Sequence, residues 1–472
     1  MIVGTVIGAG IFKKPQDVAA SIPYFGLVAA VWMVGGMLAA AGALIYAEVA
    51  VRYPRSGGNY VFLREAYGPL AGFLYGWVEF WIIRSASIAA LGIVLVESLA
   101  VVLRSPALRV SSIEPFLAGF WSQRAVTVGV ILLLGAVNVA GVRWGGALQL
   151  GLTIIKVAAV VGLAVLPLLA WLLPATGTAH TENWQPLWPP LGQLSPAKFG
   201  VALVGVLWAY HGWMNAAFVA EEVKNPRRDL PIALLGGAAL VVVLYLAVNT
   251  AFASVFSQQE MSRLKDTTVA AEFSKRLLGP IGGAAAAAAV LCSAFGAING
   301  NLLGGSRLVF AMGRDGMAPA AFGRVHPRFH SPAWAIAALT AWSGILVLGA
   351  AALSRQRLSW LLIESLGLDL NVPSGKAAFD ILTTYAMFGA VAFETAAVAA
   401  IFVLRRREPV ARVGYRCPAY PVLPTAYVSA MAVILVSMFL QQRTEAAAGV
   451  AFIAVGAAAY GMFARSPWRS VN

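Results

Sequence analysis

The chain has 472 residues, of which 60% are hydrophobic and 11% are charged, and its formal net charge is +14. Apolar segments long enough to cross a bilayer recur along it, which excludes a soluble globular protein and indicates a polytopic membrane protein. In this class a positive charge first reflects the positive-inside rule, so we expect no nucleic-acid partner. The two cysteines, Cys292 and Cys417, form no metal-binding spacing and suggest no disulfide framework, and we expect neither a metal nor a cofactor.

The first apolar run contains three glycines, Gly4, Gly8 and Gly10. Glycine weakens a membrane helix and lets backbone N–H and C=O groups become available to a ligand. Small residues four apart also allow close helix packing, and the sequence leaves this alternative open. A nucleotide-binding loop would require a soluble βαβ unit to follow, but another apolar span follows. A broken transporter helix, the third interpretation, predicts a second break in the matching half of the chain.

Apolar runs between charged or Pro/Gly-rich breaks predict about twelve transmembrane helices. Their expected limits are 1–22, 26–51, 69–101, 124–142, 147–172, 198–220, 230–256, 281–311, 333–353, 379–404, 421–440 and 445–464. Only about seven residues precede Gly8, roughly 10 Å of helix, so we expect the chain to lack the start of its first helix.

An even number of spans places both termini on one side of the membrane. The loops around Arg52, Lys224, Arg314 and Arg405 then lie together on that side and carry an excess of basic residues. The positive-inside rule therefore predicts cytoplasmic termini and a multi-pass protein of the cell inner membrane. The longer loops on the other side, 173–197 and 354–378, are rich in Pro, Trp and Ser and are expected to lie partly in the interface.

The sixth span supplies the second break, because His211 and Gly212 lie in its middle and Asn215 follows one turn later. Two interrupted helices in corresponding positions of two five-span halves indicate inverted repeats with a substrate site between them. Helix N-termini offer free N–H groups to a carboxylate, and helix C-terminal carbonyls accept hydrogen bonds from an ammonium. An α-amino acid carries both groups.

Several motifs resemble the amino acid–polyamine–organocation (APC) transporter superfamily, closest to its L-type amino acid transporter (LAT) branch and bacterial serine/threonine exchanger-like relatives. These motifs are 8–12, 54–58, 208–213, 221–231, 304–307, 313–316 and 415–421. The resemblance implies an all-α, LeuT-like fold of five plus five inverted helices in which helices 1 and 6 are broken. Its expected division is a first repeat at 1–172, a second at 198–404 and two trailing helices at 421–464.

The resemblance also implies a substrate site made largely of backbone. The N–H groups of Gly8, Ala9 and Gly10 would hold the carboxylate of the amino acid. Carbonyls just before the breaks, at Val6, Ile7 and Tyr210, would accept hydrogen bonds from its ammonium. The other residues expected at this site are Ile11, Ala209, His211, Gly212 and Trp213.

Lys156 lies in the middle of an otherwise apolar fifth span, too central to reach the interface easily. It is either a structural lysine bonded to carbonyls of a broken helix or a proton carrier. The resemblance places this lysine against the first helix, where sodium-coupled relatives of the fold hold sodium. We therefore expect sodium independence.

Other polar residues within the spans leave alternatives open. Glu79 and Arg84 either pair or face water, and Glu394 has no partner evident from the sequence. His211 stands where relatives often carry a small or acidic residue, and it either hydrogen-bonds the substrate, restricts the pocket, titrates near neutral pH or is structural. Three small polar residues of the eighth span, Cys292, Ser293 and Asn299, either border the side-chain pocket or make helix contacts.

The sequence therefore predicts a sodium-independent secondary transporter of neutral L-amino acids that works by exchange. Proton-coupled symport and a non-transporting amino acid sensor are the alternatives. The four histidines form no catalytic cluster, so an enzyme is not expected. The expected partners of the protein are its amino acid substrate and the lipid bilayer. The protein itself is expected to be a monomer or a weak homodimer. The loop at 102–123 contains no cysteine, so no disulfide-linked heavy subunit is expected.

Overall fold

The computed structural model describes residues 2–105, 116–117, 119–172, 181–190, 195–264, 267–355, 378–408, 414–441 and 443–465. Every regular element in these residues is helical. The helices are α1 (Ile2–Val6), α2 (Gly10–Ser21), α3 (Phe25–Arg52), α4 (Asn59–Tyr67), α5 (Pro69–Val78), η1 (Glu79–Arg84), α6 (Ser85–Leu103), α8 (Phe120–Ala140), α9 (Val142–Leu172), η3 (Thr181–Trp184), α10 (Pro196–Tyr210), η4 (Trp213–Glu222), α11 (Pro226–Val255), α12 (Gln258–Ser262), α13 (Val269–Arg314), η5 (Ala320–Gly323), α14 (Ala333–Arg355), α16 (Ala378–Arg407), α17 (Val422–Gln441) and α18 (Arg443–Arg465).

Within the described residues, nine helical segments are long and apolar enough to cross a membrane. One of them joins α5, η1 and α6 into a continuous span from Pro69 to Leu103. The all-α polytopic class predicted from the sequence is therefore confirmed. The interrupted pairs α1/α2 and α10/η4, together with α18, are the further candidate spans, so the count of twelve stays a prediction.

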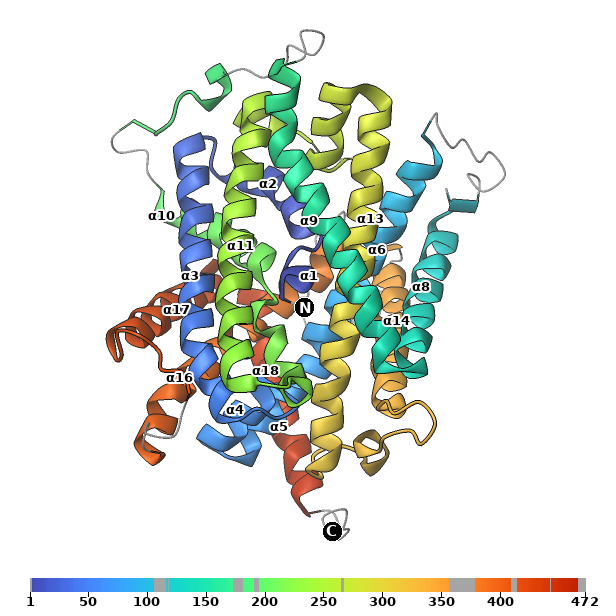
Figure 1. Cartoon of the computed structure of the whole chain (residues 1–472), viewed down its shortest axis with the longest axis vertical. Coiled ribbons are helices and arrows are strands. Elements are labelled where there is room, and N and C mark those ends of the chain that lie inside the picture. The colour runs from blue at the N-terminus through green and yellow to red at the C-terminus, as the bar shows by residue number, and fades with distance from the viewer. Residues whose placement is uncertain are drawn as a thin grey trace.

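Two interrupted helices lie at the centre of the molecule and run antiparallel to each other. The segment α2 packs against α10, while α1 packs against η4. Figure 1 places α1 near the middle of the bundle, and it contacts α9, α11 and α13. Opposed breaks of this kind bring four half-helix ends to one region.

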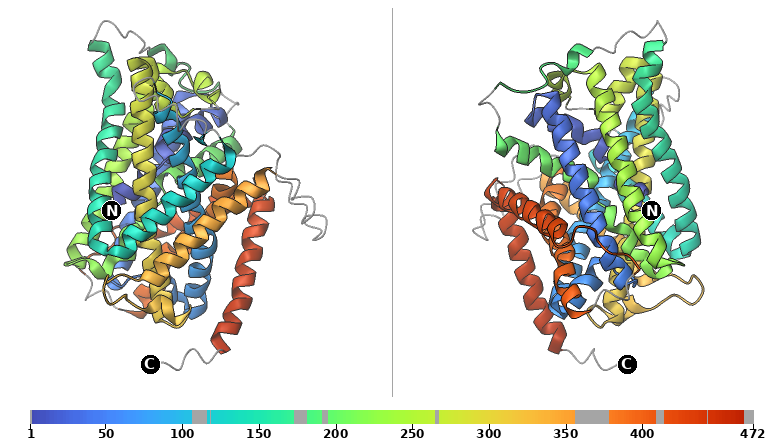
Figure 2. Two further views of the ribbon diagram at one scale, coloured as in Figure 1. Left: turned by 90° about the vertical axis from the view of Figure 1, so that its right-hand side faces the viewer. Right: turned by 60° about the vertical axis from the view of Figure 1, so that its left-hand side comes forward.

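Corresponding spans of the two predicted repeats also pack together. These pairs are α3 with α11, α6 with α13, and α8 with α14. Such pairing is expected for an inverted repeat, whereas the division at 1–172, 198–404 and 421–464 stays a prediction. The last helix, α18, packs against α5 and α16 and lies at the edge of the molecule in Figure 2.

The short helix α4 was not predicted, because its nine residues are too few for a span. It has an apolar buried face that includes Tyr60, Phe62 and Leu63. Gly58 precedes it with φ 52°, and Gly68 ends it with φ 97°. Positive φ values of this size favour glycine, which places the helix between two sharp turns.

A buried carboxylate joins three segments at the end of the bundle that carries α4. Glu48 of α3 is fully buried and lies 2.8 Å from Arg52 and 2.5 Å from Arg405 of α16. It also accepts a 2.8 Å hydrogen bond from the backbone N–H of Cys417. Because two guanidinium groups and an N–H surround it, Glu48 can stay charged although it is buried.

Candidate functional site

The first interruption lies between Val6, where α1 ends, and Gly10, where α2 begins. The Gly8 N–H donates a 2.7 Å hydrogen bond to the Val6 carbonyl. The N–H groups of Ala9, Gly10 and Ile11 have no acceptor among the residues that the structure describes. These are the orphan donors expected at a helix N-terminus, where the helix dipole also favours an anion. Three backbone N–H groups were predicted to donate to the substrate carboxylate, and those of Ala9 and Gly10 are thus available in this structure.

The second interruption begins where α10 ends at Tyr210. His211 adopts an extended conformation, and Gly212 has φ 105°, which a residue with a side chain rarely adopts. The chain then continues as the 3₁₀ helix η4, whose tighter winding differs from that of α10. The sequence prediction of a break at residues 211–212 matches this backbone.

Side chains from other helices hold the carbonyls at both breaks. The Tyr245 hydroxyl lies 2.9 Å from the Val6 carbonyl and 3.2 Å from the Ala209 carbonyl, so α11 contacts both breaks. The Ser293 hydroxyl of α13 donates a 2.9 Å hydrogen bond to the Ile7 carbonyl. Sequence reasoning missed Tyr245, although a tyrosine in an otherwise apolar span was an available signal. Ser293 was named, and it supports backbone that borders the site.

A cavity of about 50 Å³ lies between the two breaks. Of the predicted site residues, it is lined by Val6, Gly8, Ala9, Gly10, Ala209, His211 and Gly212. The lining residues that were not predicted for this site are Thr5, Ser87, Leu91, Trp208, Asn215, Ala297 and Asn301. Since one water needs roughly 10–15 Å³ by this measure, the cavity has room for about four waters. We call it the inner cavity.

Four predicted site residues do not line the inner cavity. Ile7 and Ile11 are fully buried in the packing around the first break. Tyr210 and Trp213 line a separate small cavity bounded by α3, α10, α16 and α17. Their backbone still belongs to the two breaks, but these residues are not part of the lining of the inner cavity.

His211 lines both cavities and pairs with Glu394 of α16. Its Nδ1 lies 2.8 Å from Glu394 Oε1. The sequence showed no partner for Glu394 because α10 and α16 are far apart along the chain. The pair lies within the bundle, where an ionisable residue is rarely kept without a function.

A second polar network lies beside the inner cavity. Arg84 forms an ion pair with Glu79 within η1, which confirms the pairing alternative. It also donates hydrogen bonds to Asn215 Oδ1 at 3.1 Å and Asn301 Oδ1 at 2.7 Å. Since both asparagines line the inner cavity, Arg84 fixes how their amides are presented to it.

Lys156 is fully buried, and its Nζ donates a 2.6 Å hydrogen bond to the Gly4 carbonyl of α1. This is the contact that the structural alternative predicts. Gly296 of α13 leaves room for the lysine, because a Cβ there would lie 2.9 Å from Lys156 Cε. Asn299 bonds Asn138 and Gln149, so this residue makes helix contacts and does not line the inner cavity.

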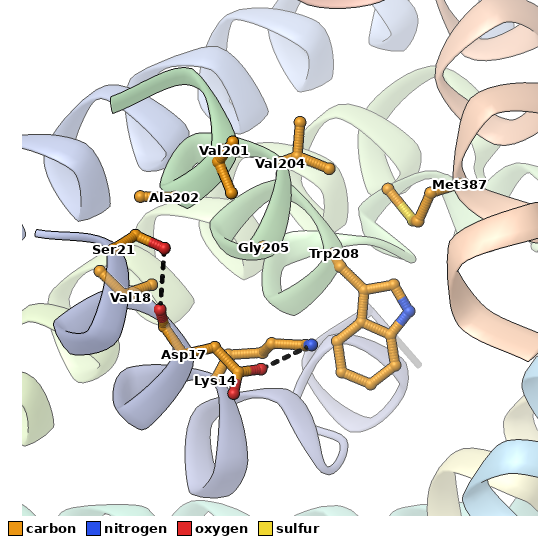
Figure 3. Close-up of a pocket in the computed structure, with 10 residues that line it drawn as sticks. All are labelled: Lys14, Asp17, Val18, Ser21, Val201, Ala202, Val204, Gly205, Trp208 and Met387. Atoms are coloured by element: carbon orange, nitrogen blue, oxygen red, sulfur yellow. Dashed lines mark hydrogen bonds and ion pairs between the residues drawn. The ribbon is translucent and has the colours of Figure 1, made fainter. Parts of the chain in front are cut away.

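A larger cavity of about 170 Å³ lies between α2 and α10. Figure 3 shows Lys14 and Asp17, 2.8 Å apart, on one side of it and Trp208 on the other. Trp208 lines this outer cavity as well as the inner one, and Lys14 Nζ lies 5.5 Å from the centroid of its ring. Trp208 therefore borders both cavities.

The opposite side of the site is closed by polar contacts between separate elements. Asp315, which follows α13, accepts a 2.8 Å hydrogen bond from Tyr60 and pairs with Arg64 of α4. Glu221 at the end of η4 accepts a 3.1 Å hydrogen bond from the Ser56 N–H and lies 3.3 Å from Arg314. We call this group the closure network. It joins α4 and the preceding loop to η4 and α13.

An all-helical membrane bundle with two opposed interrupted helices around a central cavity defines a secondary-transporter fold. Sequence comparison agrees, because residues 1–463 match the family described as amino acid permease. The chain belongs to this amino acid permease family. It is a membrane protein with several spans, and not an enzyme.

Individual relatives are transporters and exchangers of amino acids. The chain is 30% identical to the serine/threonine exchanger SteT of Bacillus subtilis over 90% of this chain and 85% of SteT. It is 32% identical to the human cystine/glutamate transporter, over 72% of this chain and 64% of that protein. It is 31% identical to the human b(0,+)-type amino acid transporter 1, over 71% of this chain and 65% of that protein. These relatives confirm the resemblance to the APC superfamily near its LAT branch.

Proposed function

We propose that this protein exchanges neutral L-amino acids across the cytoplasmic membrane by alternating access. The observation that carries the proposal is the meeting of two antiparallel breaks at one cavity. The unpaired N–H groups at the start of α2 suit a carboxylate, and the carbonyls at the ends of α1 and α10 suit an ammonium. The Val6, Ile7 and Tyr210 carbonyls are the proposed ammonium acceptors.

The inner cavity supports a neutral and small substrate. No Asp, Glu, Lys or Arg is found among the described residues that line it. A charged substrate side chain would therefore enter a small space without a formal counter-charge, which is costly in a low-dielectric site. SteT is named for two small neutral amino acids, serine and threonine, which agrees with this reading.

Sodium independence is proposed from Lys156. Its Nζ already donates to the Gly4 carbonyl of α1, so the lysine side chain occupies this side of the first interrupted helix. A sodium ion at the same carbonyl would have to displace the lysine. Exchange by rocking of the interrupted helices then needs no coupling ion at this position.

Several features of the assembled protein are also proposed. Both termini lie in the cytoplasm of a bacterial cell and the protein functions as a monomer or weak homodimer. Cys417 is buried and Cys292 lies within α13, so neither cysteine suits a disulfide to a heavy subunit. In this orientation the closure network faces the cytoplasm and the outer cavity faces the other side.

One observation favours proton-coupled symport as the second candidate. The His211–Glu394 pair, at 2.8 Å, joins an interrupted helix to α16, and rocking would separate the partners. A proton bound by the pair would then be released during transport.

Transport by proteoliposomes tests both candidates. Uptake of labelled L-alanine is measured while the internal amino acid, the proton gradient and external sodium are varied independently. Exchange predicts uptake that requires internal amino acid and ignores both ions. Gradient-driven uptake into empty liposomes would replace exchange by symport. Absence of uptake under every condition would favour the sensor.

A further inference from the structure

The pairing of His211 with Glu394 determines which nitrogen of the imidazole can meet a substrate. Because a carboxylate can only accept, a proton on Nδ1 of His211 suits the 2.8 Å ion-pair contact of this nitrogen with Glu394 Oε1. Nε2 is the ring nitrogen that does not take part in this contact. The His211 side chain is 25% exposed and lines the inner cavity, whereas Glu394 lines only the neighbouring cavity. The Glu394 carboxylate therefore contacts the imidazole ring from the side of the neighbouring cavity.

The chemistry of Nε2 selects one kind of side chain. This nitrogen accepts a hydrogen bond when the imidazole is neutral and donates one when it is protonated. A hydroxyl can both donate and accept, so it matches Nε2 in either state. A methyl group of the same size offers neither function and would leave the nitrogen unpaired in a confined space.

The remaining walls of the inner cavity agree with a small polar side chain. Ser87, Asn215 and Asn301 add polar atoms, and Arg84 holds the two amides in place. The limited volume disfavours aromatic and long aliphatic side chains.

We propose that His211, positioned by Glu394, recognises the side-chain hydroxyl of the substrate and makes the transporter selective for serine and threonine. The proposal rests on the exchange function proposed above. His211 is the specificity-determining residue, and Glu394 acts through it as a positioning residue.

The matched substrates for the test are L-threonine and L-valine, which have nearly the same shape but differ by a hydroxyl. Each is added as a competitor of labelled L-alanine exchange in proteoliposomes, and the ratio of their inhibition constants is measured. This ratio of inhibition constants does not depend on how much active transporter the proteoliposomes contain. We expect wild-type protein to bind L-threonine at least about tenfold more tightly than L-valine.

Three variants separate recognition from packing. His211→Ala and Glu394→Leu should reduce the threonine-to-valine ratio toward one. Glu394→Gln should keep most of the preference, because its amide oxygen still accepts from Nδ1. Thr395→Val is the matched control on α16, since the Thr395 hydroxyl bonds the Val391 carbonyl of its own helix and does not face His211.

The outcomes distinguish the inference from the proposed function. Alanine exchange with no threonine preference in the wild type would overturn the role of His211 and leave the exchange function standing. A ratio unchanged in His211→Ala, or lowered equally in Thr395→Val, would also overturn it. Absence of exchange for every amino acid would reject the proposed function and the inference together.

Discussion

The three glycines of the first interrupted helix have different surroundings. A Cβ at Gly4 would collide with the Thr153 side chain of α9, so this glycine permits close helix packing. A Cβ at Gly10 would lie 2.8 Å from Ala209 Cα of α10. A Cβ at Gly8 meets nothing closer than 3.8 Å and would point into the inner cavity. The helix-packing alternative is thus correct for Gly4, whereas Gly8 borders the cavity.

This difference predicts opposite effects of two alanine substitutions. Gly8→Ala should fold like the wild type but lose most of its transport, because the methyl group occupies substrate space. Gly10→Ala should lower stability by about 1–3 kcal/mol, because α2 and α10 must move apart. Thermal unfolding of the purified protein and alanine exchange check the pair. Equal destabilisation by both substitutions would contradict this account of the cavity.

Lys156 is predicted to be structural. Lys156→Met keeps most of the side-chain volume but leaves the Gly4 carbonyl without its donor. Loss of a partner from a buried polar group costs about 1–3 kcal/mol, so the thermal midpoint should fall. The dependence of exchange on internal amino acid should remain. Unchanged stability combined with a loss of proton-driven uptake would identify Lys156 as a proton carrier instead.

Cys417, in the segment between α16 and α17, should react slowly with thiol reagents. Burial, with Glu48 nearby, raises the pKa of its thiol to about 11. The thiolate is the reactive form, so alkylation at pH 7.5 should be roughly several hundred times slower than for an ordinary exposed thiol and should accelerate up to pH 11. Maleimide labelling of a Cys292→Ser variant measures this rate. Rapid labelling that levels off near pH 8.5 would contradict the burial of Cys417.

At the scale of elements, the interrupted helices and the short α4 together connect the site to one end of the bundle. Asp315 joins α13 to Tyr60 and Arg64 of α4, while Glu221 joins η4 to the loop before α4. The closure network therefore links elements from both predicted repeats. Opening at this end requires these contacts to break.

Asp315→Asn should weaken closure at this end. The Asp315–Arg64 pair is partly exposed, so its loss is worth about 0.2–1 kcal/mol. The protein should shift toward the state open at this end, and the apparent affinity should fall for external substrate and rise for internal substrate, each by less than about fivefold. A folding defect does not change the two affinities in opposite directions.

Lys275→Gln is the control for this prediction. It removes an ion pair with Glu272 that lies within one helix and links no two elements. It should leave both affinities unchanged. A change of both affinities in the same direction in Asp315→Asn would reject the closure role of this network.

At the scale of the whole molecule, the long apolar helices and both breaks were predictable from the sequence. Span length and glycine-rich interruptions act locally, so the prediction of 26–51 agrees with α3 (Phe25–Arg52). The π-helical turn η1 and the pairing of His211 with Glu394 were not predictable, because packing between distant helices produces them. The loop at 354–378 falls mostly outside the described residues, whereas residues 181–190 and 195–197 of the loop at 173–197 are described.

The candidate site also has one part that was predictable from the sequence and one part that was not. The open backbone at Gly8, Gly10 and Gly212 was predictable from the sequence, because glycine marks positions where a helix can open. The side chains that hold this backbone, Tyr245 and Ser293, come from α11 and α13. Their roles depend on three-dimensional proximity that no local pattern encodes.

The central claim is that two half-helix ends together hold a free amino acid through its carboxylate and its ammonium. The most direct measurement is inhibition of labelled L-alanine exchange by L-alanine, by L-lactate, which lacks the ammonium, and by isopropylamine, which lacks the carboxylate. The account predicts strong inhibition by L-alanine and inhibition at least about a hundredfold weaker by either analogue, because each leaves one half-helix end unpaired. Inhibition by L-lactate or isopropylamine as strong as that by L-alanine would contradict it.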